Sequence, residues 1–177
     1  MRDFEKELEE SFNEFLKDYK IDKADLENEF VQQPYLVAKW GKQHAFSVLR
    51  KGKQKAKAER AKDTIKVTEG EVELDARISP EEYSLPKVTD NAINACVMAS
   101  EKRTQSVLAS QEEFNELAGC DALEVLLSHF MEALIDRRKA LGTLQYIKYQ
   151  LKDSDEASEK ILDNLEKSVS RLKPKMM

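Results

Sequence analysis

The chain has 177 residues, of which 36% are charged and 41% hydrophobic, with only five glycines, four prolines and a net charge of -5. So few turn residues argue against an all-β fold, and a mean hydropathy of -0.64 argues against an integral membrane protein. Two cysteines, Cys96 and Cys120, are too few for a disulfide framework, and the first residues lack the order of a signal peptide. We therefore expect a cytoplasmic protein.

Apolar spacing predicts an all-α protein made of long amphipathic helices, a coiled-coil-like bundle that assembles into a homo-oligomer. The first helix is marked by apolar residues three and four apart: Phe4, Leu8, Phe12, Phe15 and Tyr19. Asp22 is expected to cap a second helix over 23–66. Pro34 either kinks that helix or restarts it.

An acidic segment, 67–90, breaks the pattern with Gly70, Pro80 and Pro86. Apolar and acidic residues alternate within it, which fits either a short strand or an extended connector. The apolar members are Val72, Leu74 and Ala76. We expect an exposed connection that turns the chain back, so that 1–66 forms one part of the protein.

A helical hairpin is predicted over 91–152, with a break at Gly119 and Cys120. Asp121 and Glu124 after the break form a capping box. From there the apolar spacing continues as a helix of about 30 residues, interrupted at Arg137 and Arg138. The remaining segment, 153–177, is predicted to be a C-terminal extension helix.

Residue patterns typical of enzymes and metal sites do not occur in the sequence. It contains no phosphate-binding glycine loop and no nucleophile elbow, and its two histidines, His44 and His129, lack metal-ligand spacing. We therefore expect no catalysis and no cofactor. A hydrolase whose site leaves no pattern in the sequence is a minor alternative.

The basic segment is the one strong functional signal, because residues 39–66 hold ten basic and two acidic side chains. On a helix its cations form two rows, separated by a narrow strip of small and apolar side chains. The strip comprises Gln54, Ala58, Ala61 and Ile65. The candidate nucleic-acid-binding cations are Arg50, Lys53, Lys55, Lys57, Arg60 and Lys62. Such density attracts a polyanion, chiefly nucleic acid, although pairing with acidic segments of the same protein or of a neighbouring subunit is the alternative.

Aromatic residues near the basic segment could stack on bases. Tyr35 and Phe46 fall on the side of Lys53 and Lys57 and are the stacking candidates. Trp40 falls on the opposite, apolar side, and we expect it in the core.

The order of these features resembles the UvsY-type recombination mediator proteins of tailed phages. The N-terminal match comprises Ile21, Asp22, Leu26, Glu29, Tyr35, Lys39, Trp40 and His44, followed by Lys57, Ala58, Glu59 and Arg60. The looser C-terminal match comprises Val107, Leu108, Leu126, Leu127, Ala133, Leu134 and Ile147. Together they cover residues 20–66 and 104–150. Glu59 stands as an insertion in the family's basic stretch.

The resemblance implies a helical, ring-like homo-oligomer without enzymatic activity, acting in the host cytoplasm and not at a membrane. Such mediators bind single-stranded DNA and help a RecA-like recombinase displace a single-strand-binding protein. The implied DNA contacts are Lys57 and Arg60, supported by Lys53, Lys55 and Lys62. The implied oligomerisation helix carries Leu123, Leu127, Phe130, Leu134, Leu141 and Leu144. A helical scaffold or adaptor, whose basic helix pairs with acidic segments, is the competing interpretation.

Overall fold

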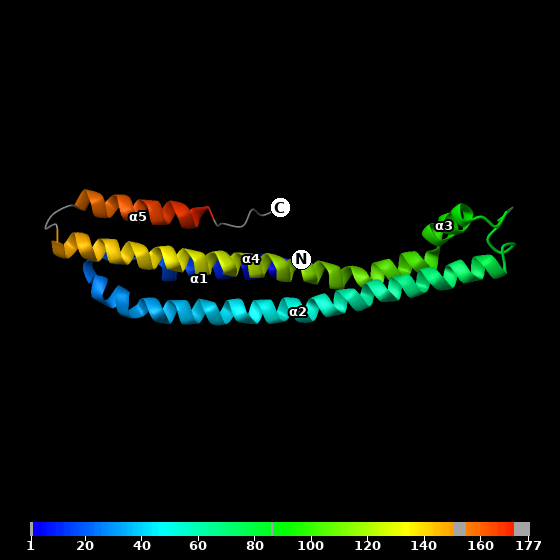
Figure 1. The fold of residues 1–177 in the computed structure, drawn as a ribbon, viewed down its shortest axis with the longest axis horizontal. Helices are drawn as coiled ribbons and strands as arrows, with labels where there is room; N and C mark the ends of the chain where they lie inside the picture. The colour runs from blue at the N-terminus through cyan, green and yellow to red at the C-terminus, as the bar shows by residue number, and fades with distance from the viewer. Residues whose placement is uncertain (1, 86, 151–154, 172–177) are drawn as a thin grey trace. The chain divides into compact units, whose positions relative to one another are not determined.

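Helices account for all the regular structure in the computed structural model, which describes residues 2–85, 87–150 and 155–171 (Figure 1). They are α1 (Arg2–Tyr19), the 3-10 helix η1 (Lys23–Asp25), α2 (Leu26–Ile78), α3 (Asp90–Ala99), α4 (Glu101–Gln150) and α5 (Asp155–Ser170). The all-α prediction is confirmed over these residues. None of the described helices combines the length and apolar content that a bilayer crossing requires.

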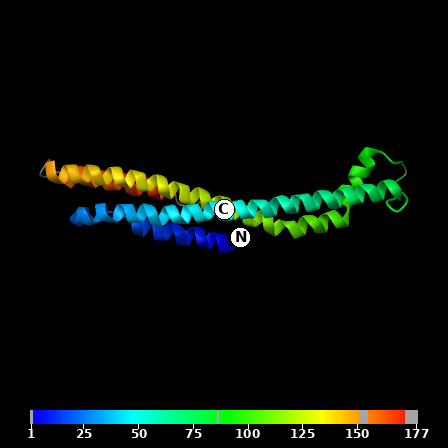
Figure 2. The same cartoon turned by 60° about the horizontal axis from the view of Figure 1, so that its bottom comes forward.

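The chain divides into two compact units. Residues 1–50 and 119–177 form the first, which we call the bundle unit, and residues 51–118 form the second, the hairpin unit. This division differs from the predicted boundaries at 66, 90 and 152, because α2 and α4 each contribute to both units. Figure 2 gives a second view of the same helices.

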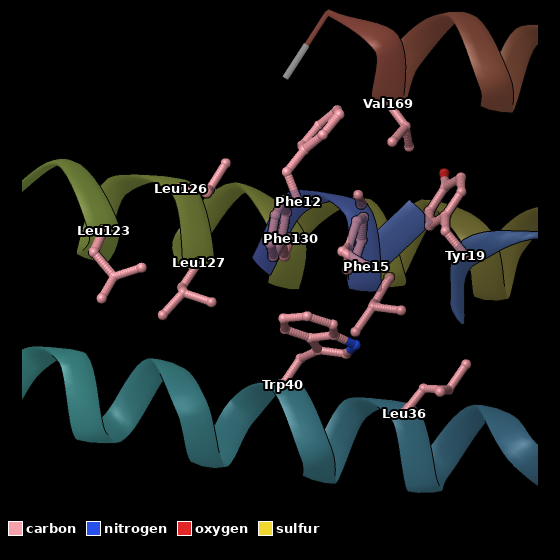
Figure 3. Close-up of a cluster of buried hydrophobic side chains, with 12 residues drawn as sticks. Phe12, Phe15, Tyr19, Leu36, Trp40, Leu123, Leu126, Leu127, Phe130 and Val169 are labelled. Carbon is pink, nitrogen blue, oxygen red and sulfur yellow. The ribbon is translucent and has the colours of Figure 1, made fainter. Parts of the chain in front are cut away.

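Aromatic side chains form the core of the bundle unit (Figure 3). Phe15 of α1 and Phe130 of α4 stack with ring centroids 4.0 Å apart, and Trp40 of α2 meets both rings edge-on at 5.2 Å. All three side chains are fully buried. Burying one such side chain stabilises a fold by roughly 1.5–3 kcal/mol, so this contact holds α1 against α2 and α4. The apolar stripe predicted for α1 and the core position of Trp40 are confirmed.

The indole N–H of Trp40 also has a hydrogen-bond partner. Its indole N–H donates to Asp18 Oδ2 at 3.0 Å, and the same oxygen accepts from Lys39 Nζ at 2.6 Å. Lys39 also pairs with Glu14, and these carboxylates raise the pKa of its ammonium against the opposing effect of burial. The contact therefore ties α1 to α2 without leaving a buried donor unpaired.

The six residues implied to be subunit contacts lie inside the bundle unit instead. Leu123, Leu127, Phe130 and Leu134 belong to the aromatic core, whereas Leu141 and Leu144 pack around Leu26. None of the six is more than 5% exposed. The assignment to oligomerisation is corrected, because α1, α2 and α5 of the same chain cover the apolar face of α4.

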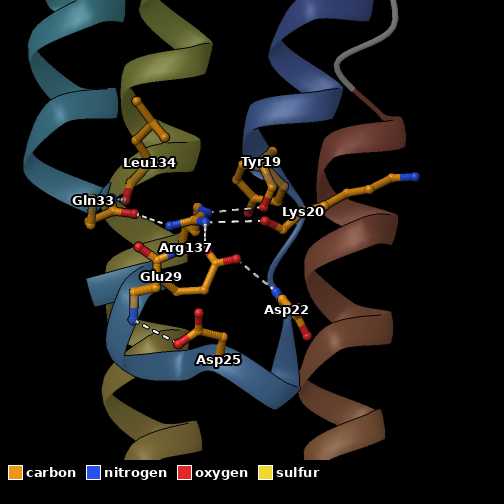
Figure 4. Close-up of polar contacts among 9 residues, drawn as sticks. Tyr19, Lys20, Asp22, Asp25, Glu29, Gln33, Leu134 and Arg137 are labelled. Carbon is orange, nitrogen blue, oxygen red and sulfur yellow. Dashed lines mark hydrogen bonds and ion pairs between the residues drawn. The ribbon is translucent and has the colours of Figure 1, made fainter. Parts of the chain in front are cut away.

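Arg137 fixes the corner between α1 and α2 (Figure 4). Its guanidinium is 1% exposed and contacts Glu29 and Gln33 of α2. It also donates to the carbonyl oxygens of Tyr19 and Lys20 at 3.1 Å each. The last carbonyls of a helix have no partner within that helix, so Arg137 caps the C-terminus of α1. In the sequence, Arg137 only interrupts the apolar pattern, so this role was not predicted.

Asp22 caps the short helix that follows this corner. Its Oδ1 accepts from Ala24 N–H at 2.8 Å, at the start of η1, and α2 begins at Leu26. The capping role is confirmed, but for η1. Helix α2 then continues through Pro34, so the proline does not restart it.

The hairpin unit shows that the predicted connector is too long. Helix α2 runs to Ile78, so the segment between helices is 79–89 and contains no strand. The helix persists because Val72 and Ala76 continue the buried spacing and are both fully buried. Val72 packs against Ile93 and Val97 of α3, which outweighs the weak helix propensity of Gly70.

The predicted helical hairpin over 91–152 is divided at a different place. The chain leaves the helical conformation at Ser100, where α3 ends and α4 begins, and α4 is unbroken through Gly119. Cys120 and Leu123 are buried and continue the apolar spacing across that glycine. The predicted break and capping box at 119–124 are therefore wrong.

Candidate nucleic-acid interface

The six candidate cations lie on α2, and all of them except Arg50 belong to the hairpin unit. Gln54 and Ala58 are buried against the unit, and Ala61 and Ile65 are half-buried. This burial confirms that the strip of small and apolar residues is the packed face. The flanking cations are exposed to solvent: Lys53, Lys55, Lys57, Arg60 and Lys62.

A buried polar contact fixes how α2 is aligned with α4 in this unit. The Gln54 amide donates to the carbonyl oxygen of Glu113 at 3.1 Å and to its Oε2 at 2.7 Å. Further along, Arg103 Nε donates to Glu69 Oε1 at 2.7 Å. A polar residue in an apolar seam specifies register at some cost in stability. These two contacts lie on either side of four of the candidate cations: Lys55, Lys57, Arg60 and Lys62.

The part of α4 between those contacts holds a single charged residue, Glu112. Residues 104–111 contain serine, threonine, glutamine and apolar side chains but no acid. Because α2 and α4 pair through Gln54–Glu113 and Glu69–Arg103, this uncharged stretch lies along the cations from Lys55 to Lys66. Residues 104–111 of α4 therefore offer these cations no acidic partner.

Four of the candidate cations have no ion pair with any residue that the structure describes: Lys53, Lys55, Lys57 and Arg60. Lys62 pairs with Glu59 at 3.0 Å, and Lys66 approaches Asp63 at 4.0 Å. The hydrogen bond from Lys62, with the nearby lysine charges, lowers the pKa of the Glu59 carboxyl. Exposed pairs of this kind contribute little to stability, so a phosphate can replace the carboxylate as the partner of Lys62.

Arg50 is placed differently from the other five. It belongs to the bundle unit, where its Nη1 donates to both carboxylate oxygens of Glu7 at 2.8 and 3.0 Å. Its guanidinium also lies 4.6 Å from the ring centroid of Phe4. Arg50 is therefore engaged by α1, and we remove it from the group of cations available to a ligand.

The two predicted stacking aromatics are both exposed, Tyr35 by 72% and Phe46 by 58%. Both belong to the bundle unit, so the structure does not join them to the cations of the hairpin unit in one site. Arg137, whose structural role was not predicted, has partners more than 100 residues away in the chain. No local pattern could have indicated them.

No metal centre is evident in the described part of the chain, where no three histidine, cysteine, aspartate or glutamate side chains gather closely enough to hold an ion. His44 is half-buried on α2, and His129 is exposed on α4. No family model, curated protein or solved structure matches the chain. The resemblance to phage recombination mediators therefore stays a prediction from the residues quoted for it.

Proposed function

We propose that this chain is a non-enzymatic protein that binds single-stranded DNA through its sugar–phosphate backbone. The observation that supports the proposal most is a group of four exposed cations that make no ion pair with any described residue: Lys53, Lys55, Lys57 and Arg60. A cation that already has a carboxylate partner must exchange it to bind phosphate, whereas these four need only release solvent and counterions. Binding of this kind tolerates any sequence and weakens steeply with salt.

The finer role that we propose is recombination mediation, which rests on the resemblance. The protein would hold a single strand in a form that favours nucleation of a RecA-like recombinase filament in place of a single-strand-binding protein. This chain would hydrolyse no nucleotide. The free energy that displaces the single-strand-binding protein would come from DNA binding by several copies of the basic helix.

Self-association is part of this proposal, but it needs contacts other than the six buried residues of α4. Large apolar side chains remain exposed on the bundle unit, among them Leu49 by 62%, Val125 by 52% and Ile135 by 57%. We propose that subunit contacts form over such positions.

The double substitution Lys57→Ala/Arg60→Ala tests the proposed site. We expect affinity for a single-stranded oligonucleotide to fall at least about tenfold at low salt, because two phosphate contacts are lost. Lys17→Ala/Arg138→Ala is a matched control, since it also removes one exposed lysine and one exposed arginine that have no ion pair with a described residue. The control should bind like the unmodified protein, as measured by fluorescence anisotropy.

Equal losses in the two double variants would contradict the site, because binding would then follow total charge alone. The scaffold alternative predicts another result. No oligonucleotide would bind, and Lys57→Ala/Arg60→Ala would instead weaken salt-sensitive self-association, as measured by light scattering.

A further inference from the structure

A cavity of about 240 Å³ lies in the bundle unit, where α1, α2 and α4 meet. Its walls are formed by Glu7, Ser11, Gln43, Phe46, Ser47, Arg50, Leu123 and Leu127. Pockets for drug-sized ligands measure about 300–1,000 Å³, so this cavity suits one small ring system. The function proposed above does not use it.

Apolar groups line one side of the cavity. Leu123 and Leu127 project from α4 toward α2 (Figure 3). Both are buried, whereas Phe46 on α2 is 58% exposed although it also lines the cavity. A flat ring entering here would meet leucine side chains inside and a phenyl ring that solvent reaches. Bases stack on exposed aromatic rings in this way.

Some polar side chains of the cavity already have hydrogen-bond partners in the protein, and others do not. Glu7 and Arg50 satisfy each other, and Ser47 Oγ donates to the carbonyl oxygen of His44 at 2.8 Å. The side chains of Gln43 and Ser11 make no hydrogen bond to any described residue. An amide with both its donor and its acceptor free can pair with an edge that presents an acceptor beside a donor, as glutamine pairs with bases.

We propose that this cavity receives a nucleobase of the bound strand, with Phe46 stacking on its face and Gln43 pairing with its edge. The inference rests on the proposed function, because a protein that binds single-stranded DNA meets nucleobases in every strand that it binds, which favours a base over an unrelated heterocycle. The cavity thereby adds a contact to bases where the basic segment contacts only phosphate.

Two oligonucleotides of equal length test the inference, one of thymidines and one in which every position is abasic. Both carry the same phosphates, so binding to phosphate alone cannot distinguish them. We expect the unmodified protein to bind the thymidine strand about tenfold more tightly, since stacking contributes a factor of this order per base. Gln43→Ala/Phe46→Ala should remove the difference, and Phe46→Tyr should keep it. Circular dichroism confirms that each variant is folded.

Tyr35→Ala is the matched control, because Tyr35 is an exposed aromatic on the same helix and in the same unit but outside the cavity. It should keep the preference for bases. A preference that survives Gln43→Ala/Phe46→Ala, or that Tyr35→Ala abolishes, would overturn the inference. Equal, salt-sensitive binding of both strands would also overturn it while the proposed function stands. Failure of both strands to bind would instead contradict the proposed function itself.

Discussion

A single buried arginine, Arg137, fixes the corner between α1 and α2. Arg137 brings a positive charge into the bundle unit and meets Glu29, Gln33 and two terminal carbonyl groups of α1 there. Removing one member of such a group is costly, because the remaining charge stays buried without a partner. The neighbouring Arg138 is exposed and makes no ion pair with a described residue.

These two arginines give a direct comparison. Arg137→Met should lower the free energy of unfolding by about 3 kcal/mol or more, whereas Arg138→Met should change it by less than about 0.5 kcal/mol. Urea unfolding followed by the fluorescence of the single tryptophan, Trp40, measures both, since Trp40 lies in the core of the same unit. Equal effects would show that Arg137 does not hold the corner.

The buried hydroxyl of Tyr19 should make the free energy of unfolding depend on pH in the alkaline range. Its hydroxyl is buried without a hydrogen-bond partner in the described structure, and burial, with the charge of Asp136, raises its pKa to about 12. Between pH 10 and pH 12 the folded state keeps this proton while the unfolded state loses it. Stability should therefore fall over that range, by up to about 2–3 kcal/mol.

Tyr19→Phe isolates this effect. The variant should be no less stable than the unmodified protein at pH 7, because it removes an unpaired buried hydroxyl. It should also lose less stability between pH 10 and pH 12. Urea unfolding at several pH values measures both, and an unchanged alkaline loss in the variant would assign the effect to another group.

At the scale of the helix, two glycines of α4 have opposite surroundings. A Cβ added at Gly142 meets nothing within 4 Å, whereas one added at Gly119 would lie 2.5 Å from Cγ of Phe4. Alanine is favoured over glycine inside a helix by about 0.8–1 kcal/mol. Gly142→Ala should therefore stabilise the protein by about that amount.

Gly119→Ala gains the same propensity but must displace the ring of Phe4, which also lies beside Arg50. We expect net destabilisation in the unmodified background and stabilisation in a Phe4→Ala background. A double-mutant cycle of unfolding free energies measures this coupling. Additive effects would contradict the close approach of Phe4 to α4.

The positions of the helices could be predicted from the sequence where the apolar spacing was strong. The ends of the helices could not. The stripe of α1 and the packed strip around Ala58 lie where three- and four-residue spacing put them. The end of α2 was misplaced because alternation around Val72 is compatible with a strand, and only contact with α3 shows that the residue belongs to a helix. Gly119 was taken for a break because a capping-box pattern follows it, and its contact with Phe4, which is distant in sequence, leaves no local signal.

For the whole molecule, the candidate site was predictable in its residues but not in their partners. Cation density selected the segment of α2, and five of its six proposed residues are exposed in the hairpin unit. The pairing of Arg50 with Glu7 depends on how α1 packs, which no local spacing encodes. For the same reason the apolar face of α4 was assigned to subunit contacts before the structure placed it within one chain.

The salt dependence of binding to a single-stranded oligonucleotide tests the central claim most directly. A plot of log affinity against log salt concentration should fall linearly, with a slope of about -0.7 for each phosphate that a cation contacts. Contacts from Lys53, Lys55, Lys57 and Arg60 would give a slope near about -3 for one copy, and Lys57→Ala/Arg60→Ala should roughly halve it. A slope near zero, or one that the double substitution leaves unchanged, would contradict the account.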